Sequence, residues 1–283
     1  MLTRAITGFI FILTIIAGIY FNEIIAMSLF SLIVLIGLDE FYGLVKKSKV
    51  IKPIRFWGTL TGFSLILILC LIALDISPIK FVFIPIIMIF ITFLIELYRT
   101  NENPFVNIAY TLLGISYIVI PFAMLFHLGF YAVSSFTNEY SFQIILGFFI
   151  MLWTNDTGAY LAGRFFGKHK LFERISPKKT WEGSFGGGLL TLAAAYILSL
   201  FFTNLDLTNW IVISILVAIF GGLGGLLTAI FGGLGDLVES MLKRSLNIKD
   251  SGNILPGHGG ILDRFDGLLL SIPFIYSYLY LIS

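Results

Sequence analysis

The sequence consists largely of long, continuous apolar runs that are separated by short polar segments. A transmembrane helix needs about 20 mainly apolar residues, and nine runs approach or reach that length. Apolar residues do not alternate with polar ones in these runs, so they predict helices and not the strands of a membrane barrel. The runs are Ala5–Tyr20, Ile24–Leu38, Phe56–Leu74, Phe81–Leu97, Phe105–Phe126, Phe142–Leu161, Gly183–Phe202, Trp210–Leu234 and Gly267–Ile282.

This pattern predicts an all-α polytopic integral membrane protein with about nine transmembrane helices. Only Phe21–Glu23 separates the first two runs, which form either a tight hairpin or one broken element, so eight is the second count. The first run follows Arg4 and has no small-residue cleavage site, so we expect a retained span and not a signal peptide. We divide the chain into N-terminal helices (1–104), middle helices with a basic cytoplasmic loop (105–182) and C-terminal helices (183–283).

Composition narrows the class of protein further. Apolar residues make up 58% of the chain and charged residues 12%, and the mean hydropathy is +0.98. These values exclude a disordered chain, a collagen, a coiled coil and an ordinary cytosolic domain. The single cysteine, Cys70, excludes a disulfide framework and a cysteine-based metal site.

The basic residues predict the orientation in the membrane. With nine spans, 17 of the 18 Lys and Arg residues fall on one side, and Lys80 alone falls on the other. Short cytoplasmic loops carry the excess of positive charge, so the N-terminus is expected in the cytoplasm.

One heptapeptide occurs twice. Ala218–Gly224 and Ala229–Gly235 both read AIFGGLG, and their offset is close to three helical turns. This spacing favours a stripe of small residues for close helix packing. A phosphate-binding loop is the alternative, but no GxxxxGK[ST] is present and neither copy opens a βαβ unit.

Three polar clusters lie at the ends of spans on the side expected to be cytoplasmic. They are Asn155–Tyr160, Ser176–Gly183 and the segment from Asp236 to Asp266. The third cluster contains several carboxylates together with Lys and Arg. Hard oxygen ligands beside cations suggest that Mg²⁺ and phosphate groups bind together. A zinc site is not expected, because soft ligands are missing and the three His are far apart in sequence.

Simpler interpretations exist for some of these residues. Basic residues beside a membrane often only enforce topology or contact anionic lipids. His258, between two glycines, is either a turn residue or a point of close ligand approach. Asp236 is harder to explain in this way because it follows the uncharged segment Trp210–Gly235, and ionisable groups at membrane depth usually have a function.

The third cluster resembles the signature of the phosphatidate cytidylyltransferases, the CDP-diacylglycerol synthases. The matching string is Ser240-x-x-Lys243-Arg244-x₄-Lys249-Asp250-x₅-Pro256-x-His258-Gly259-Gly260-x-x-Asp263-Arg264-x-Asp266. The segments from Asp156 to Tyr160 and from Ser176 to Gly183 look like upstream motifs of the same family. The specific resemblance covers roughly 155–267.

The resemblance implies transfer of the cytidylyl group of CTP to phosphatidate, which gives CDP-diacylglycerol and pyrophosphate. It also implies Mg²⁺, with two divalent ions as one option, a homodimer, and an enzyme of the inner membrane whose polar pocket opens to the cytoplasm. No nucleic acid partner is expected. On this basis we assign metal binding to Asp236 and Asp263, with Asp266 as a third candidate, and phosphate binding to Lys243, Arg244 and Arg264. Further candidates for substrate binding are Asp156, Ser176, Lys178, Lys179, Ser240, Lys249 and His258.

Two other functions are considered. A CTP-dependent polyprenol or phytol kinase belongs to the same superfamily, but the complete string from His258 to Asp266 argues against it. A polytopic transporter predicts ionisable residues in the middle of its spans and broken helices in two matching halves. Here the charges gather at one face, and the two halves do not correspond.

Overall fold

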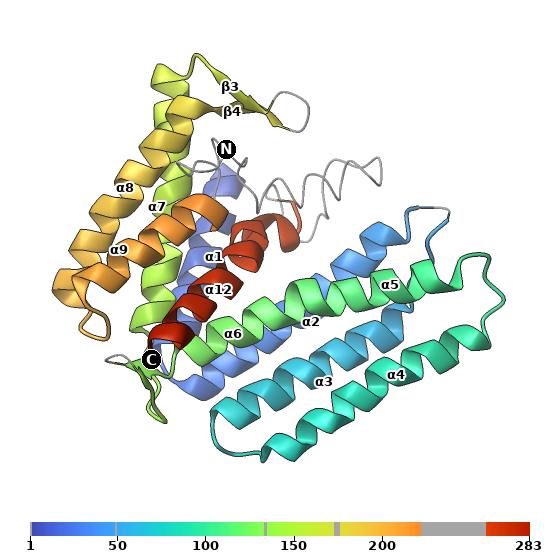
Figure 1. Cartoon of the computed structure of the whole chain (residues 1–283). Helices are drawn as coiled ribbons and strands as arrows, with labels where there is room; N and C mark the ends of the chain where they lie inside the picture. Colours follow the sequence, from blue (N-terminus) through green and yellow to red (C-terminus); the bar gives the residue numbers. More distant parts are fainter. Residues whose placement is uncertain (1, 49, 133–134, 173–175, 222–258) are drawn as a thin grey trace. The chain divides into compact units, whose positions relative to one another are not determined.

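The computed structural model describes residues 2–48, 50–132, 135–172, 176–221 and 259–283, and these parts are mostly helical (Figure 1). Two short π-helical segments, η2 and η3, continue longer α-helices, and a 3-10 turn, η1, leads into α4. The elements are α1 (Leu2–Tyr20), α2 (Glu23–Val45), α3 (Arg55–Ala73), η1 (Ile79–Val82), α4 (Phe83–Leu97), α5 (Pro104–Gly114), η2 (Ile115–Val119), α6 (Ile120–Leu128), β1 (Tyr131–Ala132), β2 (Ser135–Phe136), α7 (Gln143–Phe166), β3 (Lys170–Phe172), β4 (Ser176–Thr180), α8 (Trp181–Phe201), α9 (Leu207–Leu216), η3 (Val217–Gly221) and α12 (Leu262–Ile282).

The described helices match the apolar runs of the sequence. Seven helical stretches are long and apolar enough to cross a membrane, and Ile6–Tyr20 and Leu207–Gly221 are shorter apolar helices. The run that begins at Trp210 is described only as far as Gly221. The all-α, multi-pass membrane fold is therefore confirmed, whereas the exact number of crossings and the cytoplasmic N-terminus stay predictions.

The first two apolar runs form two separate helices. Asn22, between them, caps α2, because its side-chain oxygen accepts a hydrogen bond from the backbone nitrogen of Ile25 at 2.8 Å. The helices pack against each other, with Gly18 of α1 facing the side chain of Leu29 on α2. This arrangement is the hairpin and not the single broken element.

The chain forms two compact units. The first is Met1–His127 with Leu246–Asp263, and the second is Leu128–Ser245 with Arg264–Ser283. The boundary between them therefore falls in the first turn of α12, immediately after Asp263.

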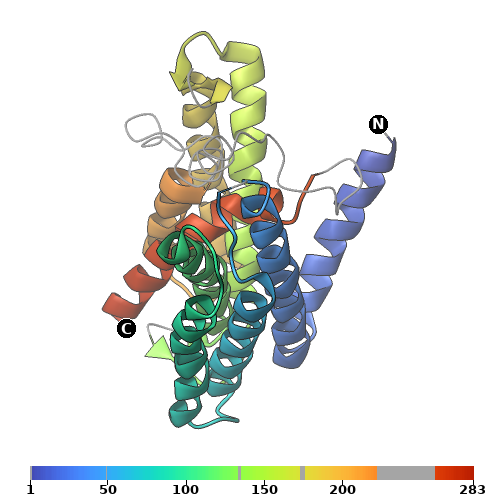
Figure 2. The ribbon, with the colours of Figure 1, turned by 90° about the vertical axis from the view of Figure 1, so that its right-hand side faces the viewer.

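In the first unit, α2, α3, α4 and α5 pack side by side, as the views in Figure 1 and Figure 2 show. A buried polar network joins these helices at one end. The Tyr42 hydroxyl donates to the carbonyl of Thr111 at 2.6 Å. Asn107 donates to the buried carboxylate of Glu96 at 2.7 Å and accepts from the backbone nitrogen of Lys52 at 2.7 Å. The basic loop after α2 is thus tied to α4 and α5.

In the second unit, α7 and α8 form a close pair because glycines remove side chains from their contact. A Cβ atom on Gly158 would lie 2.9 Å from the carbonyl oxygen of Gly186, and one on Gly187 would lie 2.6 Å from Oδ1 of Asn155. α9 packs on the same pair, and its fully buried Trp210 lies against Gly147 of α7.

Two short antiparallel hairpins were not anticipated from the apolar runs. β1 pairs with β2, with Tyr131 opposite Phe136. β3 pairs with β4, with Lys170 opposite Thr180 and Phe172 opposite Ser176. The second hairpin lies beyond the adjacent ends of α7 and α8 (Figure 1), and it carries the second polar cluster of the sequence.

Candidate active site

The second polar cluster is held by the junction of β4 with α8. Thr180 is the last residue of β4 and the N-cap of α8, and its hydroxyl accepts a hydrogen bond from the backbone nitrogen of Gly183 at 3.2 Å. Such a cap satisfies one of the unpaired N–H groups of a helix start. Gly163 and Gly167, at the end of α7, leave room for the Thr180 side chain. The hairpin is therefore fixed against both helix ends.

Glu182 binds the other arm of this hairpin. Its carboxylate accepts from the backbone nitrogen of His169 at 3.2 and 3.3 Å, and its Oε1 lies 2.7 Å from the Nδ1 of His169. The backbone nitrogen of Trp181 donates to the carbonyl of His169 at 3.0 Å. These contacts close the loop between α7 and α8 and hold the strand that carries Ser176, Lys178 and Lys179.

Lys179 differs from an ordinary surface lysine of a basic loop. Lys179 is only 6% exposed, whereas lysines are almost never fully buried in proteins unless they are paired. Lys178 and Ser176 lie on the same strand.

The first polar cluster lies on α7, below the hairpin. Asn155 is completely buried between α7 and α8, and its amide has no hydrogen-bond partner among the described residues. The next residue, Asp156, is half-buried. A buried amide in a helix pair normally has a partner. Asn155 is therefore a further polar position beside the candidate Asp156, and the sequence analysis named it only as the start of the first cluster.

The end of the third cluster, from Arg264 on, lies in the part of α12 that packs on α7. In the second unit the ring of Phe265 packs edge to face on Phe149 of α7, with 6.5 Å between the ring centroids. Gly267 lies against Leu152 of α7 and against the backbone of Gly221. Phe265 separates Arg264, which is exposed, from Asp266, which is half-buried. Within the second unit, Arg264 and Asp266 of the third cluster and the first cluster are thus carried by helices that pack together.

The carboxylates at the start of α12 take part in local hydrogen bonds. Asp263 Oδ2 accepts from the backbone nitrogen of Gly260 at 2.9 Å, like the back-reaching half of a capping box. Asp266 Oδ1 accepts from the backbone nitrogen of Gly267 at 2.7 Å. Asp263 and Asp266 are three residues apart in one helix, a spacing that places side chains on the same face.

Gly259 shapes the chain before this helix. Its φ of +83° is rarely adopted by residues with a side chain, and a Cβ atom there would lie 2.6 Å from Asp263 Oδ2. The glycine therefore permits both the turn and the close approach of the carboxylate. Its neighbour His258 lies outside the described residues, as do Asp236, Ser240, Lys243, Arg244 and Lys249.

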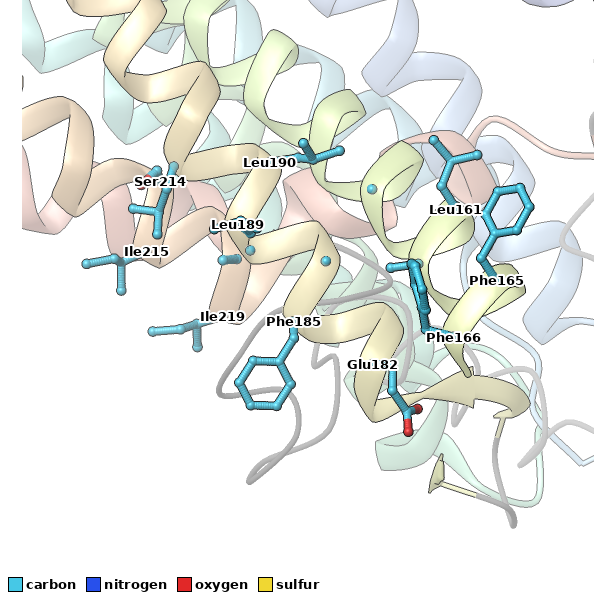
Figure 3. A pocket seen from close by; sticks show the side chains of 16 residues that line it. Leu161, Phe165, Phe166, Glu182, Phe185, Leu189, Leu190, Ser214, Ile215 and Ile219 are labelled. Carbon is cyan, nitrogen blue, oxygen red and sulfur yellow. The ribbon is translucent and has the colours of Figure 1, made fainter. Parts of the chain in front are cut away.

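An apolar groove of about 630 Å³ lies on the second unit, between residues of α7, α8 and α9 (Figure 3). Phe185 and Leu189 of α8 and Ile215 and Ile219 of α9 line it, and the carboxylate of Glu182 lies at one end. A groove of this composition suits hydrocarbon, and Glu182 and Ser214 are the polar side chains in its lining. Within the described parts of the chain, no three His, Cys, Asp or Glu residues are grouped closely enough to hold a metal ion. The expected metal set includes Asp236, which lies outside them.

One residue that contacts the candidate site was not assigned to it from the sequence. Glu40 of α2 is buried, and its carboxylate accepts hydrogen bonds from the backbone nitrogens that begin α12. The available signal was the Asp39-Glu40 pair at the end of an apolar run, a position that interfacial contacts alone can explain.

Comparison with known proteins agrees with the motif. The sequence model of the cytidylyltransferase family matches residues 2–282. Three similar relatives carry the name phosphatidate cytidylyltransferase. They come from Staphylococcus haemolyticus (strain JCSC1435), at 42% identity, from Staphylococcus saprophyticus, at 39%, and from Staphylococcus aureus (strain COL), at 38%. Each alignment covers 177 residues, which is 62% of this chain and 60% of the relative. Because the family match spans nearly the whole chain, this protein belongs to the cytidylyltransferase family.

Proposed function

We propose that the protein transfers the cytidylyl group of CTP to phosphatidate and so forms CDP-diacylglycerol and pyrophosphate. Family membership over residues 2–282 is the observation that carries the proposal. The relatives named phosphatidate cytidylyltransferase support the choice of substrates. We assign the reaction to the cytoplasmic membrane, with the site open to the cytoplasm, on the distribution of basic residues. A homodimer is part of the proposal.

The transfer of the cytidylyl group depends more on positioning of the substrates and stabilisation of charge than on a general base. A phosphate monoester has a second pKa near ~6, so phosphatidate is largely dianionic at neutral pH and is already a nucleophile. Its attack on the α-phosphorus of CTP forms the new P–O bond and releases pyrophosphate. The main obstacles are repulsion between two polyanions and the growing charge on the leaving group.

The basic residues are suited to lowering this repulsion. Lys179 lies on the hairpin beside α7, and Arg264 lies on α12, which packs on α7. Lys179, its neighbour Lys178 on β4 and Arg264 would hold phosphate oxygens of CTP or of the lipid. Lys243 and Arg244, which precede α12 in the signature, are assigned the same role.

We propose Mg²⁺ as the cofactor, held by Asp263, Asp266 and Asp236. Carboxylate oxygens are the donors that this ion prefers. Asp263 and Asp266 supply such oxygens on one helix face, which fits the ion, and both are already oriented by backbone N–H groups. When bound, the ion would neutralise phosphate charge and polarise the phosphoryl group.

The test uses the full chain in detergent with phosphatidate, Mg²⁺ and CTP labelled at either the α- or the γ-phosphate. We expect α-label in the lipid product and pyrophosphate in solution. Transfer of γ-label to lipid would instead identify a CTP-dependent kinase. No label in lipid, together with solute uptake by vesicles that contain the protein, would identify a transporter and refute the proposal.

A further inference from the structure

Glu40 of α2 lies against the start of α12, although 221 residues separate it from Ile261. Its Oε2 accepts a hydrogen bond from the backbone nitrogen of Ile261 at 2.8 Å, and its Oε1 lies 3.4 Å from the backbone nitrogen of Leu262. Glu40 is 7% exposed, and all three residues belong to the first unit. The buried carboxylate thus accepts hydrogen bonds from two backbone N–H groups.

These contacts act as a helix cap that is supplied by another helix. The first N–H groups of a helix have no partner within it. Ile261 directly precedes the helix, and its apolar side chain cannot accept a hydrogen bond as an N-cap side chain does. Asp263 takes the nitrogen of Gly260, and Glu40 takes the next two. A negative charge at this end of a helix is also favoured by the helix dipole.

The capped turn is the one that carries Asp263. Its backbone nitrogen follows directly after the two that Glu40 binds, and Gly259 before them has the positive φ described above. Leu262 also packs near Gly37, one helical turn before Glu40 on α2. The direction of the Asp263 carboxylate therefore depends on where α2 holds this turn.

We infer that Glu40 is a positioning residue for the reaction, which fixes the first turn of α12 and so aims Asp263 at the bound cation and phosphates. The inference rests on the proposed function. It assigns no direct contact with substrate to Glu40, whose oxygens are occupied by the backbone of Ile261 and Leu262. Residues that orient ligand-bearing segments typically change metal affinity or activity by 10–100-fold when they are replaced.

Asp39 provides a matched control on the preceding residue of the same helix. Its carboxylate is half exposed and pairs with Arg55 at 2.6 Å, so it shares the charge and location of Glu40 but not the contact with α12. The variants are Glu40→Gln, which keeps the side-chain length but loses the charge and one acceptor, and Asp39→Asn.

Each variant is purified as the full chain and measured for cytidylyl transfer against Mg²⁺ concentration, and for hydrogen exchange of the backbone around Ile261. For Glu40→Gln we expect kcat to fall by about tenfold or more, the Mg²⁺ concentration for half-maximal rate to rise, and exchange at 261–262 to become faster. Asp39→Asn should match the unsubstituted chain in all three.

The outcomes separate the possible roles. A lower melting temperature for Glu40→Gln, with unchanged kcat and Mg²⁺ dependence of the folded fraction, would show a purely structural role and overturn the inference. Unchanged exchange at 261–262 would overturn the cap itself. If the unsubstituted chain transferred no cytidylyl group, the proposed function would fall, while the exchange measurement would still decide whether Glu40 caps α12.

Discussion

Glu182 and His169 are joined at two points, since the Glu182 carboxylate contacts both the backbone nitrogen of His169, at 3.2 Å, and its ring Nδ1, at 2.7 Å. Glu182 is in the first turn of α8, and His169 directly precedes β3. The pair therefore clamps the base of the hairpin whose second strand carries Ser176, Lys178 and Lys179.

Loss of this clamp should affect activity more than stability. The His169 side chain is 78% exposed, and exposed ion pairs stabilise proteins only weakly. We expect Glu182→Ala to leave the melting temperature nearly unchanged and to lower kcat/KM by about tenfold or more, because misplaced binding groups are costly. His169→Ala keeps the backbone contact and should be milder. Equal kinetics for Glu182→Ala and the unsubstituted chain would contradict this.

Asp263→Asn should abolish activity while the protein stays folded in the membrane. The amide oxygen of Asn can still accept the hydrogen bond from Gly260, so the start of α12 keeps this contact. The negative charge needed at a hard-cation site is lost. We expect less than about a tenth of the activity at saturating Mg²⁺, with an unchanged melting temperature. Asp236→Asn should behave alike, and higher residual activity would remove the residue concerned from the site.

Gly259→Ala should displace the Asp263 carboxylate, because the added methyl group would lie too close to it. A φ of +83° costs a residue with a side chain about 1–2 kcal/mol, and the added Cβ would lie 2.6 Å from Asp263 Oδ2. We expect lower stability together with a higher Mg²⁺ concentration for half-maximal rate. Gly43→Ala is the control, because its Cβ would meet nothing closer than Arg55 at 3.9 Å. Wild-type kinetics for Gly259→Ala would show that the carboxylate tolerates displacement.

The apolar runs were sufficient to predict the helices, because a membrane span must satisfy its backbone hydrogen bonds internally. Each described helix of the fold lies on such a run. The β3–β4 hairpin escaped this reasoning because its pairing is short and its strands, KLF and SPKKT, lack a period-2 pattern of apolar residues.

The site was only partly predictable for a different reason. The signature marks Asp263, Arg264 and Asp266 through their spacing in one stretch of chain. The contact of Glu40 with Ile261 joins positions that are far apart in sequence, and no local pattern reports such a contact. The burial of Lys179 likewise depends on how the hairpin sits on the helix ends. Local motifs thus identify the chemistry but not the residues that hold it in place.

Topology can be tested by cysteine labelling in a Cys70→Ser background, where the removed thiol is buried in α3. The positive-inside distribution predicts cytoplasmic loops around Lys49, Lys170 and Lys249. Cysteines placed there in intact cells should resist an impermeant thiol reagent added from outside, whereas a cysteine at the exposed Lys80 should react. Labelling at position 170 from outside would overturn the orientation and the access of cytoplasmic CTP to the site.

The two lysines of β4 distinguish a topological role from a binding role. If Lys178 and Lys179 only enforce orientation, Lys→Arg substitutions should be silent, because Arg serves the positive-inside rule equally well. If they bind phosphate, a compact ammonium and a planar guanidinium are not interchangeable. Lys179 is buried on a strand that ends in the capping residue Thr180, which leaves little room for a larger head group. We therefore expect Lys→Arg at one or both positions to raise the KM for CTP or phosphatidate or to lower kcat, with cysteine labelling unchanged. Wild-type kinetics in both Arg variants would favour the topological role and remove these lysines from the site.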